Sequence, residues 1–546
     1  MRLRSTLRAA LLAANLMQAF GSGGTPPPAA AGRFQVLVAT DKAVVVQGGT
    51  TTLRARVVRA ADFDGPVMLE LTGLPAGVRA APVHVPAGVS ETSLALTADA
   101  AAPHSLPTVG AVVGAMVGAG PAAPQRSASA LAVTVAGAPG TLDASFAGGA
   151  QLTPVGAGED YAHAVAVQAD GKVLVAGSSA GGGGTGLAVV RYLRDGRLDT
   201  AFGSNGRVVL MVGARQDVAQ AIAVQADGRI LLAGHSLQRQ ADHDFLLVRL
   251  LADGRPDPAF GQRGHVLTDF GGDSDRASAV LVLPDGRIVA GGQSNVNRAT
   301  TGVDFALARY HPDGRLDPSF GAGGKVVAPI LPGSTGDRVR ALALQAVDGQ
   351  QRLLAVGGEG DFTIARFNAA GALDAGFGQG GKVTGLFGVS IGAAAAVAVR
   401  PGGEVVVAGH AGHDFAAVQL LPDGRLDTRF GPTADGRFRQ AVSAANWDEA
   451  TALALQTDGA LLLGGWAYAG TSTAGDVAVL RLSHDGRLDT AFGQAGVAIH
   501  AVAGAKADFG RALALQPDDR IPAVRAIVAG EAQDRNRDFA VLRLWL

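Results

Sequence analysis

The stretch DVAQAIAVQADGRILLAG, residues 217–234, contains the pattern that decides the fold. Two apolar runs flank Ala-Asp227-Gly228, and Asp-Gly between such runs is the strongest short signal of a β-hairpin. A further run, 206–210, precedes this hairpin and another, 244–249, follows it. Nothing between the runs is long and periodic enough for a helix. The segment therefore predicts four antiparallel strands.

The same segment returns along the chain, each time with an anchor of the form Leu-Asp-x-x-Phe. The anchors begin at Leu142, Leu198, Leu316, Leu373, Leu426 and Leu488, with a Pro256 variant in the remaining slot. They lie 53 to 62 residues apart, a period that indicates repeated supersecondary units. An open solenoid would need polar caps, whereas the chain ends at 538–546 on an apolar run. We therefore predict an all-β protein in which residues 138–546 form a closed seven-bladed β-propeller.

Four motifs recur together: Leu-Asp-x-x-Phe-Gly, Asp-x-Ala-x-Ala, Gln-x-Asp-Gly-(Lys/Arg) and Asp-Phe-x-x-x-Arg. Over residues 142–546 they resemble the delta-60 repeat of bacterial proteins. The resemblance implies exported or surface proteins with propeller-like arrays and no activity common to the family. The fifth unit departs most from the pattern, with Gly392 in place of the Asp, Arg400 in place of the Gln and Gln419 in place of the Arg.

Residues 33–137 lack the repeat and consist of short β-type runs separated by turn signals. The runs are 34–38, 43–46, 52–58, 67–71, 93–97 and 131–135. Such spacing predicts an antiparallel β-sandwich. The tract from Phe63 to Val78 resembles the immunoglobulin-like modules of exported bacterial proteins, which implies a spacer or a weak binding domain.

Residues 1–32 have the form of an export signal followed by a Gly- and Pro-rich linker. Three arginines precede an apolar run, 9–20, that is too short to span a bilayer. The segment resembles a bacterial lipoprotein signal, but Phe20 stands where the lipidated Cys belongs. Two positions are possible for cleavage of the signal segment, after Ala19 or near residues 29–31. We expect export to the periplasm, cell surface or exterior, without a lipid anchor and without an integral membrane span in the mature chain.

Charge and composition exclude several kinds of site. The net charge is −1, so no basic surface argues for nucleic acid, and the absence of Cys excludes disulfides and thiol chemistry. Because the Asp/Arg pairs of Asp-Phe-x-x-x-Arg recur in many units, a structural role is favoured over catalysis. These pairs are Asp244/Arg249, Asp304/Arg309, Asp361/Arg366, Asp476/Arg481 and Asp538/Arg543.

The sequence contains two weak metal patterns, and we predict no metal, no cofactor and no catalytic residue. Asp242/Asp244 and Asp273/Asp275 are Asp-x-Asp pairs without the rest of a calcium loop. His410, His413 and Asp414 have ligand-type side chains but provide too few of them for zinc.

The aromatic residues of the sixth unit are the sequence's candidates for ligand binding. Trp447, Trp466 and Tyr468 lie in connections that emerge on the same side of an antiparallel sheet, where the longer, variable loops are expected. Aromatic side chains there can stack on a sugar ring or a partner side chain. We therefore expect a non-catalytic binding or scaffold protein of the bacterial envelope, with a protein or carbohydrate ligand on this variable-loop face. The alternatives are a propeller enzyme, a lyase or hydrolase on a carbohydrate-like substrate, and a purely structural surface component.

Overall fold

The computed structural model describes most of the chain, in two compact units. It covers residues 33–105, 107–117, 126–213, 215–239, 242–272, 274–296, 299, 302–331, 336–443, 447–468, 475–502, 507–517, 524–533 and 535–546. The signal-like segment 1–32 and Asp273 lie outside these residues. The first unit ends at Ala136 and the second begins at Gly137. Over the described ranges the secondary structure is β apart from one 3-10 turn, Ala147–Gly149, and no helix could cross a membrane.

The first unit is built from two sheets that share one apolar core. One sheet has the order β1 (Phe34–Val38), β3 (Thr50–Arg59), β7 (Glu91–Ala98), β5 (Val78–Ala80). The other has the order β2 (Lys42–Val46), β9 (Arg126–Ala136), β8 (Thr108–Met116), β4 (Val67–Thr72), β6 (Val83–Val85). All pairings are antiparallel except β2 with β9.

The core of the first unit follows from period-two alternation along its strands. In β7 every second residue from Leu94 is buried, and Leu94 and Leu96 pack in one cluster with Val45, Val112 and Val133 of the other sheet. The six runs expected from the sequence coincide with β1, β2, β3, β4, β7 and β9, and this agreement confirms the strand predictions for the unit.

The described residues of the second unit form seven four-stranded antiparallel sheets. The first sheet has the order β11 (Asp160–Val167), β12 (Val173–Gly181), β13 (Gly184–Tyr192), β14 (Arg207–Leu210). The second has the order β15 (Asp217–Val224), β16 (Ile230–Arg239), β17 (Asp242–Leu250), β18 (His265–Thr268). The third has the order β19 (Arg276–Val282), β20 (Ile288–Ser294), β21 (Asp304–Tyr310), β22 (Lys325–Ala328). The fourth has the order β23 (Val339–Val347), β24 (Gln350–Gly357), β25 (Thr363–Phe367), β26 (Lys382–Thr384). The fifth has the order β27 (Gly392–Val399), β28 (Val405–Ala411), β29 (Asp414–Leu420), β30 (Arg437–Gln440). The sixth has the order β31 (Asp448–Leu455), β32 (Leu461–Tyr468), β33 (Gly475–Leu482), β34 (Val497–His500). The last has the order β10 (Ala150–Thr153), β37 (Arg537–Trp545), β36 (Val524–Gln533), β35 (Ala507–Pro517).

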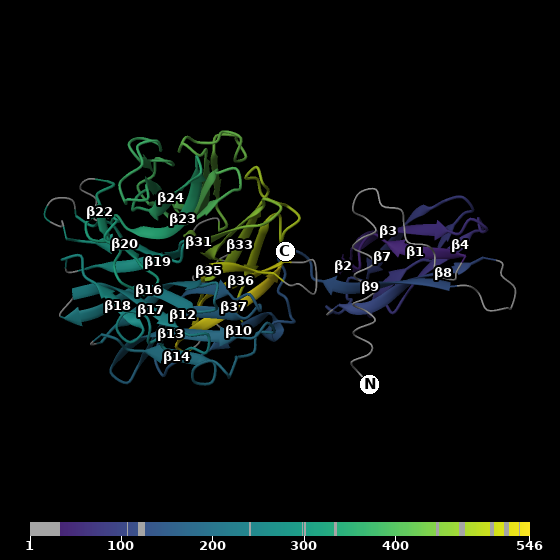
Figure 1. Ribbon diagram of the computed structural model, residues 1–546, viewed down its shortest axis with the longest axis horizontal. Coiled ribbons are helices and arrows are strands. Elements are labelled where there is room, and N and C mark those ends of the chain that lie inside the picture. The colour runs from purple at the N-terminus through teal and green to yellow at the C-terminus, as the bar shows by residue number, and fades with distance from the viewer. Residues whose placement is uncertain are drawn as a thin grey trace. The chain divides into compact units, whose positions relative to one another are not determined.

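The sheets are offset by one strand from the units read in the sequence. The first run after each anchor pairs with the sheet of the preceding unit, as β14 does with β13. The first anchor is therefore followed by β10, which pairs with β37 from the other end of the chain. The first strands contact one another in order from β11 to β35, and β35 contacts β11 again. Figure 1 shows these sheets following one another around a common centre.

The junction between the two ends of this unit is held by charge as well as by strand pairing. Asp143 of the first anchor is fully buried and receives Arg525 at 2.6 Å and Arg543 at 2.8 Å, both from the last sheet. The guanidinium of Arg543 also lies over the Phe146 ring, 4.9 Å from its centroid. The two ends are thus joined by an arginine that contacts an anchor aspartate and an anchor phenylalanine, a contact that recurs within the unit.

A β-bulge in every first strand explains why the strand beside it carries a glycine at the facing position. In β11 the pairing with β12 passes from Ala162 to Ala164, so His163 is an extra residue. The same shift occurs in each of the seven first strands. Opposite each bulge lies a glycine: Gly177, Gly234, Gly292, Gly357, Gly409, Gly465 and Gly530. A Cβ there would lie 1.8 to 2.0 Å from a backbone carbonyl oxygen, so only glycine fits.

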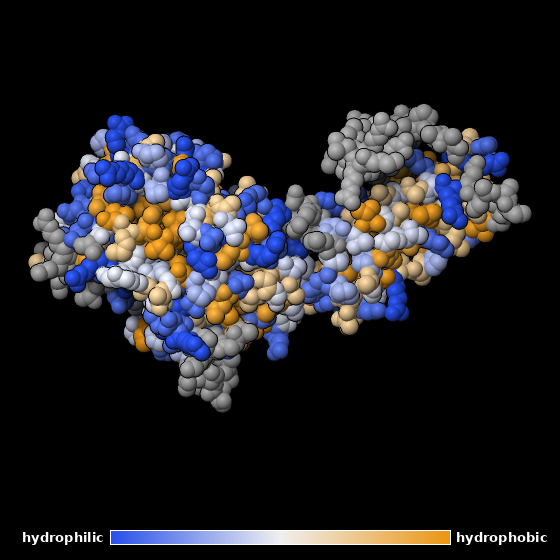
Figure 2. Space-filling model, turned by 90° about the horizontal axis from the view of Figure 1, so that it is seen from below, coloured by the Kyte–Doolittle hydropathy of each residue, from blue (hydrophilic) through white to orange (hydrophobic). Residues whose placement is uncertain are grey.

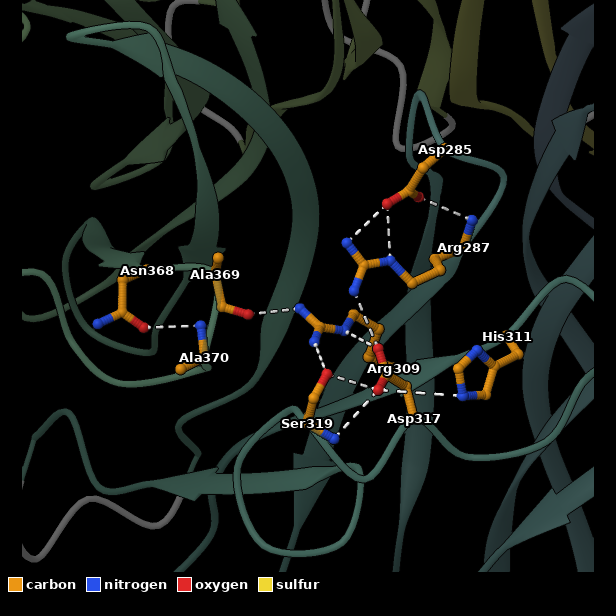
Figure 3. A network of polar contacts seen from close by, with 9 residues as sticks. All are labelled: Asp285, Arg287, Arg309, His311, Asp317, Ser319, Asn368, Ala369 and Ala370. Atoms are coloured by element: carbon orange, nitrogen blue, oxygen red, sulfur yellow. Dashed lines mark hydrogen bonds and ion pairs between the residues drawn. The ribbon is translucent and has the colours of Figure 1, made fainter.

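In five of the units a buried arginine ties the anchor to the next unit; these are Arg191, Arg249, Arg309, Arg366 and Arg543. Arg309 donates through Nε to Asp317 at 2.8 Å, lies 4.6 Å over the Phe320 ring, and donates to the Ala369 carbonyl at 2.5 Å. Figure 3 shows this network, with Arg287 between Asp285 and Asp317. Burial by itself would raise the pKa of Asp317, but hydrogen bonds from Ser319 and Arg287 and the charge of Arg309 hold it below its usual value.

In this network the arginine of Asp-Phe-x-x-x-Arg is not paired with the aspartate of its own motif. The arginine pairs with the anchor aspartate that follows it, as Arg249 does with Asp257 and Arg366 with Asp374, and not with the aspartate five residues before. That earlier aspartate has other partners: Asp361, for instance, accepts the backbone N–H groups of Phe387 and Gly388. The recurring charges therefore join sheets, because the arginine also reaches the backbone of the next unit, as in the bond from Arg366 to the Pro422 carbonyl.

The fifth unit keeps this contact through a reciprocal exchange. Gln419 replaces the usual arginine and donates to Asp427 at 2.9 Å. Arg400, which replaces the usual glutamine, donates to Gln419 at 2.8 Å and to the carbonyls of Gly459 and His484 in the next unit. The two departures from the repeat pattern therefore compensate each other, because Arg400 and Gln419 exchange places and together keep the contact with Asp427.

The glycine opposite a bulge provides a test of this backbone device. Gly177→Ala should destabilise the second unit by about 1–3 kcal/mol, because the new Cβ would overlap the Tyr161 carbonyl oxygen. Gly181→Ala on the same strand is the matched control, since nothing lies within 4 Å of a Cβ there. Urea unfolding of the two variants measures the difference, and equal midpoints would contradict the argument.

The buried arginine contact provides a second test. Arg309→Gln should cost about 3 kcal/mol of unfolding free energy, because it leaves Asp317 buried with fewer donors. Arg315→Gln removes an exposed pair with Asp313, and such pairs contribute about 0–1 kcal/mol. If thermal or urea unfolding shows the two substitutions to be equivalent, the arginine contact does not hold the sheets together.

Candidate functional site

A cavity of ≈ 550 Å³ lies where the first strands of the second unit begin. Its wall includes the variable positions of Asp-x-Ala-x-Ala, among them Tyr161, His163, Gln220, Ser278, Ala395 and Thr451. Because the bulges turn these positions inward, each sheet contributes a different side chain to one place. The volume is in the usual range of small-molecule sites.

Arginines dominate the charge of this cavity. Arg276, Arg338, Arg340, Arg511 and Arg537 line it, against the acidic residues Glu449 and Glu531. Five guanidinium groups and two carboxylates leave an excess of positive charge, although the whole chain has a net charge of −1. The cavity therefore concentrates positive potential that the composition does not reveal.

The carboxylates neutralise only part of the wall. Glu531 is buried and receives Arg511 at 2.7 Å, while Arg537 donates its backbone N–H to Glu159. Glu449 lies 3.6 Å from Nδ1 of His410. Arg276 approaches the His243 ring at 3.4 Å, a neutral contact when that ring is unprotonated.

The histidines of the cavity remain neutral near pH 7. Burial, followed by the charge of Arg511, lowers the pKa of His163 to about 4. Burial, followed by Arg276 and His243, lowers the pKa of His235 to about 3. In the neutral state each imidazole can both donate and accept a hydrogen bond, so these side chains add polarity without further positive charge.

Aromatic side chains form part of the cavity wall and continue beyond it. The Tyr161 and His163 rings are stacked 6.4 Å apart, and Arg537 lies 5.3 Å over Tyr161 and 5.8 Å from the Phe509 ring. Phe509 in turn contacts Trp466 at 5.1 Å. The aromatic residues expected in the sixth unit are therefore continuous with the cavity wall through Phe509.

The structure brings together two of the three aromatic residues predicted from sequence. Trp466 and Tyr468 meet edge to face at 5.6 Å. Trp447 packs instead on His413 at 4.6 Å and His410 at 6.0 Å. Trp447 is 39% exposed and Trp466 only 9%, so Trp447 presents more surface, while Trp466 mainly supports Phe509.

The weak metal candidates His410, His413 and Asp414 are engaged separately. Nδ1 of His410 faces Glu449, the His413 ring packs on Trp447, and Asp414 forms an ion pair with Arg439 at 2.6 Å. In the described ranges, the potential ligand atoms that converge belong to Asp244, Asp269 and Asp275, within 4.8 Å of one another. Burial and the neighbouring carboxylates raise the pKa of Asp244 to about 6, so crowding favours its neutral form.

Comparison with known proteins supports the repeat character of the second unit. Residues 168–202, 225–260, 283–320, 353–377 and 456–492 match a family described as "Domain of unknown function (DUF5122) beta-propeller". The second unit is a β-propeller-like repeat array. No curated protein matches the chain.

Two solved structures are similar at a low level. The YadV chaperone matches with 9% identity and a TM-score of 0.16, over 43% of this chain and 100% of that chain. Domains 4–9 of the surface layer protein SbsC match with 10% identity and a TM-score of 0.15, over 94% of this chain and 82% of that chain. At these scores neither structure informs the fold or the site.

Sequence reasoning missed the arginines of the cavity, although a signal for them was present. In Asp-x-Ala-x-Ala the two x positions differ in nearly every unit, for example Arg338 and Arg340 in one and Glu449 and Thr451 in another. Variable positions inside a strict motif indicated that the repeat array uses them for something other than packing.

Proposed function

We propose that this protein is an exported, non-catalytic binding or scaffold protein of the bacterial envelope, whose ligand enters the cavity on the variable-loop face of the repeat array. One observation supports this most: the residues that build the array repeat, whereas those that line the cavity differ from sheet to sheet. A rigid scaffold with varied side chains in one concave place is the usual arrangement of a binding site.

The location of the cavity agrees with this face. Tyr161 pairs with Ser178 near the end of β12, close to the turn at 181–184, whereas the Asp-Gly turn at Asp285 lies beside Asp317 on the opposite side. On the face that Figure 2 shows, hydrophobic residues of the array reach the surface in patches separated by hydrophilic ones.

For the fold we propose a closed seven-bladed β-propeller of delta-60-like repeats, preceded by an immunoglobulin-like sandwich. The seven sheets, the contact of β35 with β11 and the pairing of β10 with β37 support the first part. The two sheets around one core in residues 33–136 support the second. An experimental structure with another number of sheets, or with an open array, would refute this assignment.

A second candidate function is a propeller enzyme, a lyase or hydrolase acting on a carbohydrate-like substrate. The unlike polar residues in the cavity favour it. Against it, Glu531 is buried in an ion pair with Arg511, which leaves Glu449 as the more available carboxylate, whereas glycoside hydrolysis commonly uses two. Release of shortened or unsaturated products from a bound polysaccharide would establish the enzyme instead.

Export without a lipid anchor is a prediction of the first 32 residues. Fractionation of the bacterium should place the protein outside the cytoplasm, and labelling with a fatty acid should give no signal, because Phe20 has no thiol to acylate. Phe20→Cys is the matched variant and should become labelled if the remaining lipoprotein signal is intact. Retention of the native protein in the cytoplasm would contradict the export proposal.

Obstruction of the cavity tests the binding proposal. Screening the purified protein on an array of glycans and envelope lipids should give ligands whose affinity falls at least about tenfold in Ala395→Trp, because the larger side chain occupies space that the ligand needs. Val209→Trp, at an exposed position outside the cavity lining, is the control and should bind like the native protein. If every ligand found binds Ala395→Trp equally well and that variant is folded, the cavity is not the site.

A further inference from the structure

Two arginines in the cavity have buried N–H groups for which the described residues provide no acceptor. Arg338 and Arg340 are two positions apart at the start of β23, and both line the cavity. Their buried Nε–H groups donate no hydrogen bond to any of the described residues. A buried guanidinium that loses its hydrogen bonds to water and gains no protein acceptor raises the free energy of the folded state.

A third arginine strengthens this positive centre. Arg276, from the adjacent β19, lies 3.4 Å from the ring nitrogens of His243. Burial, followed by the charge of Arg338, lowers the pKa of Arg276, and the same two causes act on Arg340. Arg338 therefore repels both Arg276 and Arg340, while the charges of Glu449 from β31 and of Glu359 partly offset this effect on Arg340. An anion placed between them would relieve both the repulsion and the missing hydrogen bonds.

The rest of the wall specifies what else the ligand contains. Gln220, Ser278, Gln293 and Thr451 contribute neutral polar groups to the same cavity. Amide and hydroxyl side chains match a ligand rich in hydroxyl groups, and Tyr161 adds an aromatic ring to the same wall. A volume of ≈ 550 Å³ accommodates a small saccharide rather than a folded partner.

We propose that the cavity binds an acidic saccharide, with a carboxylate or phosphate group held by Arg276, Arg338 and Arg340 and the sugar hydroxyls by the neutral polar side chains. This inference rests on the proposed binding function and assigns the ligand class to the same site. Uronic acids and sugar phosphates share the required chemistry, because arginine binds both oxyanions through paired N–H donors.

The test measures binding of defined probes by calorimetry to the full chain. The probes are a galacturonic acid disaccharide, glucose 6-phosphate, inorganic phosphate and the neutral disaccharide maltose. At least one charged sugar should bind at least about tenfold more tightly than both maltose and inorganic phosphate. Its affinity should fall with added salt, because the interaction is between charges.

Variants connect this binding to the named arginines. Arg338→Gln and Arg340→Gln should each weaken the charged probe at least about tenfold, while the folded protein keeps or gains thermal stability because like charges are removed. Arg315→Gln, 80% exposed and outside the cavity lining, is the matched control and should leave binding unchanged.

Each outcome decides the proposal. Preference for the uronide identifies a carboxylate ligand and preference for the hexose phosphate a phosphate ligand, and either supports it. If no charged sugar exceeds maltose, if inorganic phosphate binds as well as the tightest charged sugar, or if both arginine variants bind normally, the proposal is wrong. Array ligands that Ala395→Trp blocks but Arg338→Gln and Arg340→Gln do not would reject the ligand class and leave the binding function standing.

Discussion

The structure depends on a backbone constraint, the bulge in each first strand and the glycine that faces it. The bulge adds one residue to the strand, and its neighbouring carbonyl occupies the place where a Cβ would otherwise be, as the Tyr161 carbonyl does opposite Gly177. Without that glycine the strand could not bend at this point. The bend in turn points residues such as His163, Gln220 and Arg340 to the cavity.

A second constraint, the buried arginine between an anchor and the next unit, explains which sequence changes are tolerated. Arg309 meets a carboxylate, an aromatic ring and a backbone carbonyl at once. In the fifth unit, Gln419 and Arg400 divide the same contacts between them. What the array needs is a buried donor that reaches from the anchor aspartate to the next backbone, and more than one side chain can provide it.

Function and stability therefore draw on different positions of the same repeat. The glycines opposite the bulges and the anchor phenylalanines recur in every unit, and the arginine that contacts the anchor aspartate recurs in all but the fifth. The cavity has no such symmetry, since Arg338, Glu449 and Tyr161 occupy comparable places in three sheets. A ligand that meets several sheets at once can be recognised only if their contributions differ.

The sequence by itself determined the strand pattern, the repeat and the antiparallel pairing, because hairpin turns such as Asp227-Gly228 and alternating burial are local properties. It also indicated the sandwich strands at 34–38 and 93–97, since period-two alternation needs no distant partner. Tertiary structure decided the one-strand offset between repeat and sheet, the arginine's choice of Asp317 over Asp304, and the convergence of arginines from separate sheets. These features join residues about ten to several hundred positions apart, and a one-residue bulge reverses which side a side chain faces, so no period in the sequence encodes them.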